Sequence, residues 1–366
     1  MEQLTDEVLL NIFSRLNAYD MIRAAFCCRA LRAAVTSNGR SISHSSVISF
    51  LSKGYLHQSC FWAHDPSRHA WLSISADFLT SIGIRYGKLV AADGGLVCLK
   101  ARAATNLSNG SAQKSALVIC NPIIRSSRLV FFPDQTQRPL AICMKYKGAS
   151  DGYDLFALIQ RSAHSCSMLK YISSTSSWRL MASVTSRNGY YLACNTIISC
   201  NSVLYAVWRK FEDWRIFALD GGKWAEIGVP LITAAAFKQK VLLMDVAGIL
   251  HIAVLVHNRW LEVRDLCIWK LQDNKKNWVE VSRMPIVLIE LCRKRFKTDR
   301  LVNCLSKNGI AYIVFGSFNG QWDVIMYDVH KDEWQRIEQE KVYLGNSKVI
   351  FRHPMVIFEP SFEATP

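Results

Sequence analysis

The chain has 366 residues, of which half are hydrophobic, and a formal net charge of +15. This length predicts about two domains, and the composition supplies enough apolar side chains for a large core. The twelve cysteines are spread along the chain without a C-x-x-C pair, which excludes a disulfide-dense secreted scaffold and favours reduced, buried thiols.

No secretory signal is expected, because Glu2, Asp6 and Glu7 stand where a signal peptide has basic residues and no apolar segment follows them. The longest apolar stretch covers residues 241–256 and contains Asp245 and His251. We interpret this stretch as core strands, since a membrane helix needs about 20 apolar residues. We therefore expect a soluble protein of the cytoplasm, the nucleus or both, without a membrane partner.

The positive charge is concentrated outside the N-terminal region. Residues 1–40 hold five basic and four acidic side chains, so their net charge is +1 and that of the remainder is +14. Such a surplus is typical of proteins that bind acidic partners or nucleic acid. Most of the basic residues are scattered, and the dense run RKRFKTDR at 293–300 is interpreted as a solvated loop. Nucleic acid is therefore not the expected partner.

The first predicted element is a helix within QLTDEVLLNIFSRL, residues 3–16. Thr5 can cap this helix, and the acidic residues that follow it suit the positive end of the helix dipole. At about 100° per residue the apolar side chains form one stripe, made of Val8, Leu9, Ile12, Phe13 and Leu16. Leu10 falls outside the stripe, so it either packs against the next domain or belongs to a surface that binds a partner.

Two more helices are predicted before the main domain. Asp20 can cap one through MIRAAFCCRALRAAV, and SHSSVISFLSK at 43–53 fits another, so we expect a helical linker over residues 41–60. A helical unit of this size buries too little surface to be stable by itself.

Residues 4–35, LTDEVLLNIFSRLNAYDMIRAAFCCRALRAAV, resemble an F-box. The positions that fit the family pattern are Leu4, Glu7, Leu9, Leu10, Ile12, Leu16, Ile22, Cys28 and Arg32, whereas Thr5 and Tyr19 replace usual prolines and Leu31 replaces a usual Trp. The resemblance implies docking to the Skp-type adaptor of a cullin-RING ubiquitin ligase. The adaptor-binding residues that it implies are Leu4, Leu9, Leu10, Ile12, Leu16, Tyr19 and Ile22.

A repeated phrase fills most of the remaining chain: a short apolar strand, a polar turn, then Trp and a second strand. Its key positions lie 46 to 56 residues apart, at Trp71, Ser127, Trp178, Trp224, Trp278 and Trp334. Alternating apolar residues predict half-buried antiparallel strands, and a period near fifty residues is typical of a β-propeller blade. Six units predict six blades with indoles between neighbouring sheets; the alternative is a β-sandwich with fortuitous Trp spacing.

Two phrases add a second resemblance. GGLVCLK at 94–100 and ICNPIIRSSRLV at 119–130 are similar to phrases of the kelch-like F-box-associated domains of plant F-box proteins. The predicted fold class is therefore α+β and multidomain. A helical F-box over residues 1–40 precedes the linker at 41–60 and an all-β kelch-like propeller over residues 61–360.

Motifs for catalysis are missing from the sequence, which has no P-loop, no H-E-x-x-H and no G-x-G-x-x-G after a strand. Three pairs have metal-like spacing, namely His64 with His69, His251 with His257, and His164 with Cys166. None is joined by a second ligand motif, so we expect loop or core side chains, no metal and no cofactor. A galactose-oxidase-like enzyme can also be built on a kelch propeller and stays open as an alternative.

The expected function is that of a non-catalytic substrate receptor in an SCF-type ubiquitin ligase. Such a receptor holds a target lysine near a ubiquitin-charged enzyme and raises its effective concentration. The target protein is not identified by the sequence. A ligase-independent F-box scaffold is the other alternative.

Two further expectations concern the propeller. The segment KVYLGNSKVIFRHPMVIFEP at 341–360 should complete the first blade by pairing near SCFWAHD at 59–65, because closure removes two exposed sheet edges. Arg209, Trp214 and Trp322 belong to loops opposite the Trp turns and should form a basic, aromatic site for an acidic target segment. The alternative is that these tryptophans pack between blades.

Overall fold

The structure is a computed structural model. The residues that it describes are 8, 11, 20, 47–53, 59–65, 70–82, 84, 87–103, 114–134, 139–162, 165–185, 191–210, 213–230, 238–258, 262–272, 277–295, 301–316, 322–337, 343–344, 347–348, 356–359, 361 and 364–366. Most of the repeat region is therefore covered, whereas only three residues before Val47 are.

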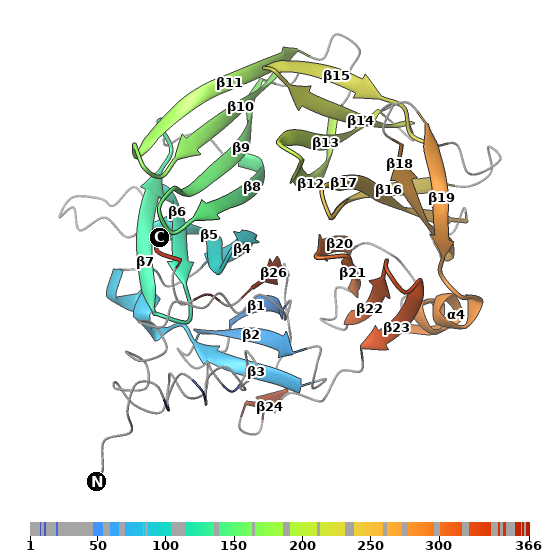
Figure 1. Ribbon diagram of the computed structural model, residues 1–366, viewed down its shortest axis with the longest axis horizontal. Coiled ribbons are helices and arrows are strands. Elements are labelled where there is room, and N and C mark those ends of the chain that lie inside the picture. The colour runs from blue at the N-terminus through green and yellow to red at the C-terminus, as the bar shows by residue number, and fades with distance from the viewer. Residues whose placement is uncertain are drawn as a thin grey trace.

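The described strands form six four-stranded antiparallel sheets that follow one another around a common centre (Figure 1). Blade 1 contains β26 (Val356–Phe358), β1 (Val47–Lys53), β2 (Ser59–Asp65) and β3 (Ala70–Ser75). Blade 2 contains β4 (Gly87–Asp93), β5 (Leu96–Ala103), β6 (Lys114–Asn121) and β7 (Ser126–Phe131). Blade 3 contains β8 (Pro139–Gly148), β9 (Gly152–Ser162), β10 (Ser165–Ile172) and β11 (Ser177–Thr185). Blade 4 contains β12 (Tyr191–Cys200), β13 (Val203–Lys210), β14 (Asp213–Asp220) and β15 (Lys223–Ile227). Blade 5 contains β16 (Lys238–Val246), β17 (Ile249–His257), β18 (Val263–Leu271) and β19 (Trp278–Arg283). Blade 6 contains β20 (Leu301–Lys307), β21 (Ile310–Gly316), β22 (Trp322–Asp328) and β23 (Glu333–Ile337). The predicted all-β propeller is thereby confirmed.

Burial differs between the inner and outer strands of a blade. Every residue of β17 after Ile249 is buried, because both faces of this strand pack against other blades. In the outer strand β19, by contrast, half-buried and exposed positions alternate. The apolar run at 241–256 thus supplies core strands β16 and β17, as expected from its sequence.

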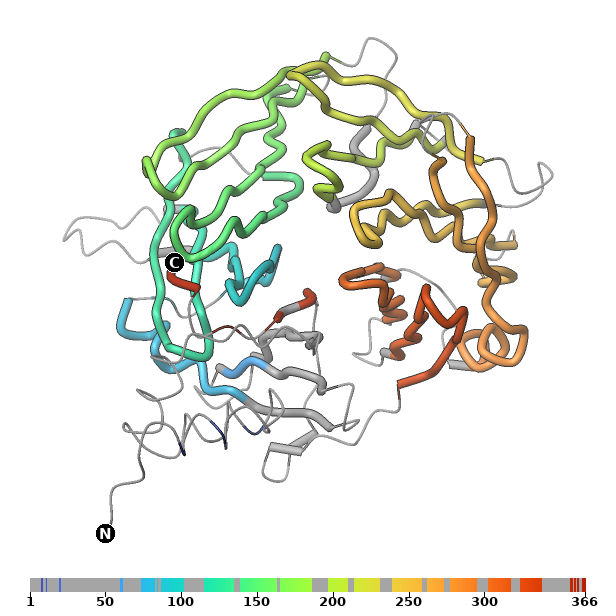
Figure 2. Tube along the Cα trace, viewed as in Figure 1, coloured from blue at the N-terminus to red at the C-terminus, as the bar shows by residue number. Residues whose placement is uncertain are grey.

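The C-terminal strand closes the ring. The tube in Figure 2 runs around the ring from blue to red in chain order, and β26 adds the last strand to the first sheet. β26 pairs with β1, with Val47 opposite Phe358, and β1 lies between it and β2, so the tail completes the first blade beside SCFWAHD. The buried Asn121 amide donates to the carbonyl oxygens of Ser361 and Ala364 at 2.7 and 2.8 Å, which anchors the chain beyond β26.

The prediction of a helical linker over residues 41–60 was wrong for residues 47–53, which form β1. The apolar residues of VISFLSK occur at spacings of two, three and four, which suits a strand as well as a helix. Pairing with β2 on one side and β26 on the other selects the strand. The propeller therefore begins at Val47.

Each blade has two unlike ends. Because strands reverse at every step, the turns that join the first to the second strand and the third to the fourth lie on one side, here called the turn face. The loops that join second and third strands lie on the other side, here called the loop face. The connections between blades also lie on the loop face, including α4 (Ile286–Arg295), which joins β19 to β20.

Candidate partner-binding surfaces

The seven side chains expected to bind an adaptor, from Leu4 to Ile22, lie outside the described residues. Val8, Asn11 and Asp20 are described and are helical. Val8 belongs to the predicted apolar stripe and is 44% exposed. At least this side chain of the stripe is thus in contact with solvent.

The key positions of the repeat are structurally equivalent. Each is the first or second residue of the outermost strand of its blade and stands opposite the end of the neighbouring strand. The pairs are Trp71 with His64, Ser127 with Cys120, Trp178 with Tyr171, Trp224 with Leu219, Trp278 with Leu271 and Trp334 with Tyr327. The repeat inferred from the sequence therefore corresponds to one blade per unit.

Three of these tryptophans link their blade to the preceding one. The indole nitrogen of Trp178 donates to the carbonyl oxygen of Phe131 at 2.8 Å, and that of Trp278 donates to Gly228 at 2.6 Å. Trp334 donates to the Ser282 hydroxyl at 3.0 Å and stacks on Tyr327, with ring centroids 4.5 Å apart. The indole nitrogens of these three residues therefore bond across neighbouring sheets.

In the second blade, Ser127 occupies the position that a Trp occupies in the other five blades. The short 3₁₀ helix η1 (Asp77–Ile82) follows β3 there, and its apolar side chains join the cluster that contains Ile123 and Leu129. Leu79 is 3% exposed within this cluster. A separate helix thus supplies the apolar contact that an indole supplies elsewhere.

The three residues proposed for target binding do not form one exposed group. Trp214 is 7% exposed and packs in a cluster with Val241 and Ile252 of blade 5, which agrees with the alternative of packing between blades. Its side chain points there because Trp214, Ile216 and Ala218 share one face of β14. Arg209 is exposed, and its guanidinium lies 5.4 Å from the Trp214 ring centroid. The Trp322 side chain lies outside the described part of the structure.

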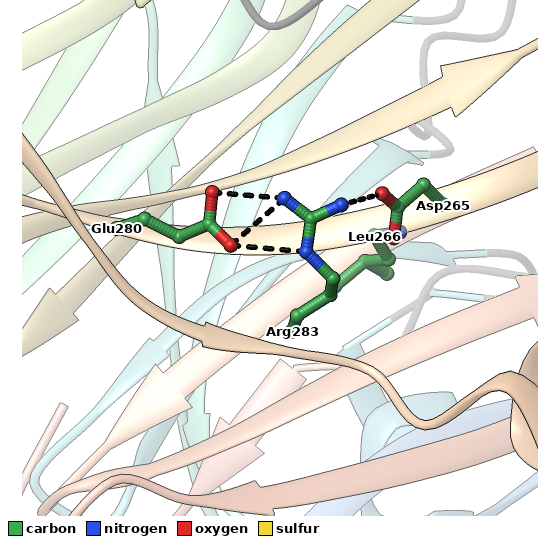
Figure 3. Close-up of polar contacts among 4 residues, drawn as sticks. All are labelled: Asp265, Leu266, Glu280 and Arg283. Carbon is green, nitrogen blue, oxygen red and sulfur yellow. Dashed lines mark hydrogen bonds and ion pairs between the residues drawn. The ribbon is translucent and has the colours of Figure 1, made fainter.

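A charged network on blade 5 was not found from the sequence (Figure 3). The Arg283 guanidinium donates to both carboxylate oxygens of Glu280 at 3.0 Å and pairs on its other side with Asp265. Asp265 also accepts from the backbone nitrogen of Leu266 at 2.9 Å. The charged residues of β18 and β19 are visible in the sequence, but the register that brings Asp265 and Arg283 together is not. The carboxylates of Glu280 and Asp265 therefore neutralise the charge of Arg283 within the blade.

Next to this network, Glu262 connects the loop after β17 to α4. Its carboxylate accepts from the Asn258 amide at 2.8 Å and lies 3.5 Å from Arg264 and 3.9 Å from Arg293. The first residues of β18 and the second half of α4 therefore meet on the loop face.

Burial makes several of the described thiols poor nucleophiles. Burial raises the pKa of Cys143 and of Cys267 to about 12, so both are protonated at neutral pH. Burial lowers the pKa of His251, whose Nδ1 lies 3.0 Å from the Ile249 carbonyl oxygen, and His257 on the same strand is also buried. Both histidines are core residues. Within the described ranges no group of three His, Cys, Asp or Glu side chains is suited to hold a metal ion.

None of the helices in the part of the chain that the structure describes has the length and apolar character of a membrane span.

Comparison with protein families places an F-box domain at residues 1–42. The chain carries an F-box domain, followed by a β-propeller. The boundary agrees with the sequence pattern at 4–35 and precedes the first strand of the propeller, Val47–Lys53. No curated protein matches this chain.

Solved structures similar to this chain include other propellers. A fungal lectin with a six-bladed β-propeller fold, the Aleuria aurantia lectin, is 12% identical with a TM-score of 0.45, and the match covers 84% of this chain and 97% of the lectin. The β-propeller domain of the Trilobed protease from Pyrococcus furiosus is 11% identical with a TM-score of 0.40, covering 81% of each chain. A prolyl endopeptidase is 14% identical with a TM-score of 0.43 over 79% of this chain, which spans only 39% of the peptidase.

Proposed function

We propose that this protein is a substrate-recognition subunit of an SCF-type (Skp–cullin–F-box) ubiquitin ligase. The F-box domain at residues 1–42 is the observation that carries the proposal. The propeller supports it, because a rigid ring of sheets presents loops that can bind a target protein. The F-box domain binds a Skp-type adaptor, and the propeller holds the target near the ubiquitin-charged enzyme. The protein itself acts by proximity and makes or breaks no bond.

Two narrower proposals rest on sequence. The phrases at 94–100 and 119–130 support a propeller of the kelch-like type found in plant F-box proteins. Gly94 and Gly95 of the first phrase form a turn in which both φ angles are positive, 54° and 86°. Function in a ubiquitin ligase places the protein in the cytoplasm, the nucleus or both.

Adaptor binding provides the direct test. We expect Leu4→Asp combined with Leu10→Asp to abolish co-purification of the full chain with a Skp-type adaptor. Burying a leucine contributes about 1.5–3 kcal/mol, and a carboxylate left without a partner in its place costs more. Co-expression followed by affinity purification measures the effect.

Leu180→Asp is the matched control, because Leu180 is an exposed leucine on the outer strand β11 of the propeller, 61% accessible. This variant should retain the adaptor, and all variants should melt at the same temperature. Undiminished co-purification of the double variant would disprove the adaptor role.

A further inference from the structure

Exposed apolar side chains gather on one segment of the propeller. Eight large hydrophobic side chains are exposed among the described residues, and five of them lie between residues 279 and 291. They are Val279 and Val281 on β19, and Ile286, Val287 and Leu291 on α4. Figure 1 shows α4 directly at the end of β19, at the outer rim of the ring. Such a concentration is typical of an interaction site, whereas single exposed apolar residues are ordinary.

The helix α4 is apolar on two opposite sides. Ile289 and Cys292 are each 2% exposed and pack, together with Leu288, into the cluster between blades 5 and 6. Val287 and Leu291, one helical turn apart, point the other way and are 65% and 36% exposed. The propeller core accounts for the first side only. The second side has the spacing with which helices present apolar side chains to a partner.

The charges around this surface are not balanced. Arg283, between the two valines and α4, is neutralised by Asp265 and Glu280 (Figure 3). Beyond Leu291, α4 continues with the basic residues Arg293, Lys294 and Arg295, and its one acidic residue is Glu290. Arg293 also lies 3.9 Å from Glu262, so Lys294 and Arg295 carry the surplus positive charge. Lys294 is exposed and forms no ion pair with any described residue. The surface is therefore apolar along its length and cationic at its C-terminal end.

We propose that the exposed side of α4, with Val279 and Val281 of β19, is the docking surface for an amphipathic segment of the target protein whose polar side is acidic. This inference rests on the proposed function and specifies the chemistry of the target. The apolar row of the segment covers Val287 and Leu291, and its carboxylates face the cationic end of α4. The net charge of +15 attracts such a segment and repels a second copy of this chain.

Selection from a phage-displayed library of random peptides of about 15 residues, which is about four helical turns, tests the proposal on the full-length protein. We expect the enriched peptides to have an excess of Asp and Glu and apolar residues at spacings of three and four. A synthetic peptide from the selection should bind at least about tenfold more weakly to the Val287→Glu, Leu291→Glu double variant, measured by fluorescence anisotropy. Raising the salt from about 0.1 M to about 1 M should also weaken its binding.

Leu180→Glu is again the matched control, because it adds the same charge at an exposed leucine on another blade, and it should change the affinity by less than about twofold. Enriched peptides without an acidic excess, or equal binding to the double variant, would overturn the proposal. So would dimerisation of the wild-type protein that the double variant lacks, since it assigns the surface to a second copy. Both variants should retain the Skp-type adaptor, so loss of peptide binding is distinguished from failure of the adaptor role.

Discussion

The indole nitrogens of the repeat tryptophans make different hydrogen bonds, although the residues occupy the same place in their blades. Trp278 donates to the Gly228 carbonyl oxygen at 2.6 Å. The buried Nε1 of Trp224 has no hydrogen-bond partner in the described part of the structure. A hydrogen bond contributes about 1 kcal/mol to the free energy of unfolding, whereas an unpaired buried donor lowers it. Loss of the N–H group should therefore change the stability of the protein differently at these two residues.

We expect Trp278→Phe to lower the free energy of unfolding by about 1 kcal/mol more than Trp224→Phe does. Both changes remove a similar volume, so Trp224→Phe controls for the loss of packing. Urea denaturation followed by circular dichroism measures both values. Equal losses would show that the indoles stabilise the propeller by packing alone.

In four of the blades the hairpin turn between the first and second strands has the same conformation. Both turn residues have positive φ at Gly94–Gly95, Asn201–Ser202, Ala247–Gly248 and Asn308–Gly309. This is the turn whose twist matches that of antiparallel strands, and it favours Gly and Asn. Only the first pair resembles the kelch phrase, so the other three were not assigned from sequence, although Asn308–Gly309 is a strong hairpin signal.

Ala247 is the exception among these turn residues, because its φ of 51° is unfavourable for a side chain that forms no local hydrogen bond. We expect Ala247→Gly to raise the free energy of unfolding by up to about 1 kcal/mol, since glycine adopts positive φ without steric cost. Thermal unfolding measures the change. The control is Gly248→Ala, which places a side chain at φ 79° and should destabilise the propeller. A loss of stability in Ala247→Gly would contradict this account of the turn.

The whole ring depends on its C-terminal strand. Val356 packs in the cluster shared by blades 1 and 2, and Ile357 packs in the cluster with Tyr312 and Val324 of blade 6. Lys307 of blade 6 pairs with Asp93 of blade 2 and lies 3.4 Å from Glu359. Burial opposes the charge of Lys307, but the two carboxylates outweigh burial and raise its pKa, which keeps the ion pairs intact at neutral pH.

We expect truncation after residue 340 to lower the melting temperature sharply or to make the protein insoluble. Truncation exposes the edge of β1, uncovers two apolar clusters and leaves the buried Asn121 amide without its partners. Ile357→Ala, which keeps the strand, should cost about 2–5 kcal/mol in the free energy of unfolding. A truncated protein that melts like the full chain would show that the ring is stable without closure.

The sequence by itself determined the local units of this protein. The F-box pattern, the strand–turn–Trp repeat and the closing strand were all predictable, because alternation, turn residues and helix capping act within a few residues of the chain. Trp178 and Trp334 were assigned to their blades on that basis.

Only the tertiary structure decided which surfaces meet. VISFLSK fits a helix or a strand until β2 and β26 pair with it, and Trp214 suits a loop or a core until blade 5 covers it. The register that joins Arg283 to Asp265 likewise depends on contacts between distant segments. So does the solvent exposure of one side of α4. Burial is a property of the assembled ring, and a side chain's own neighbours in sequence do not specify it.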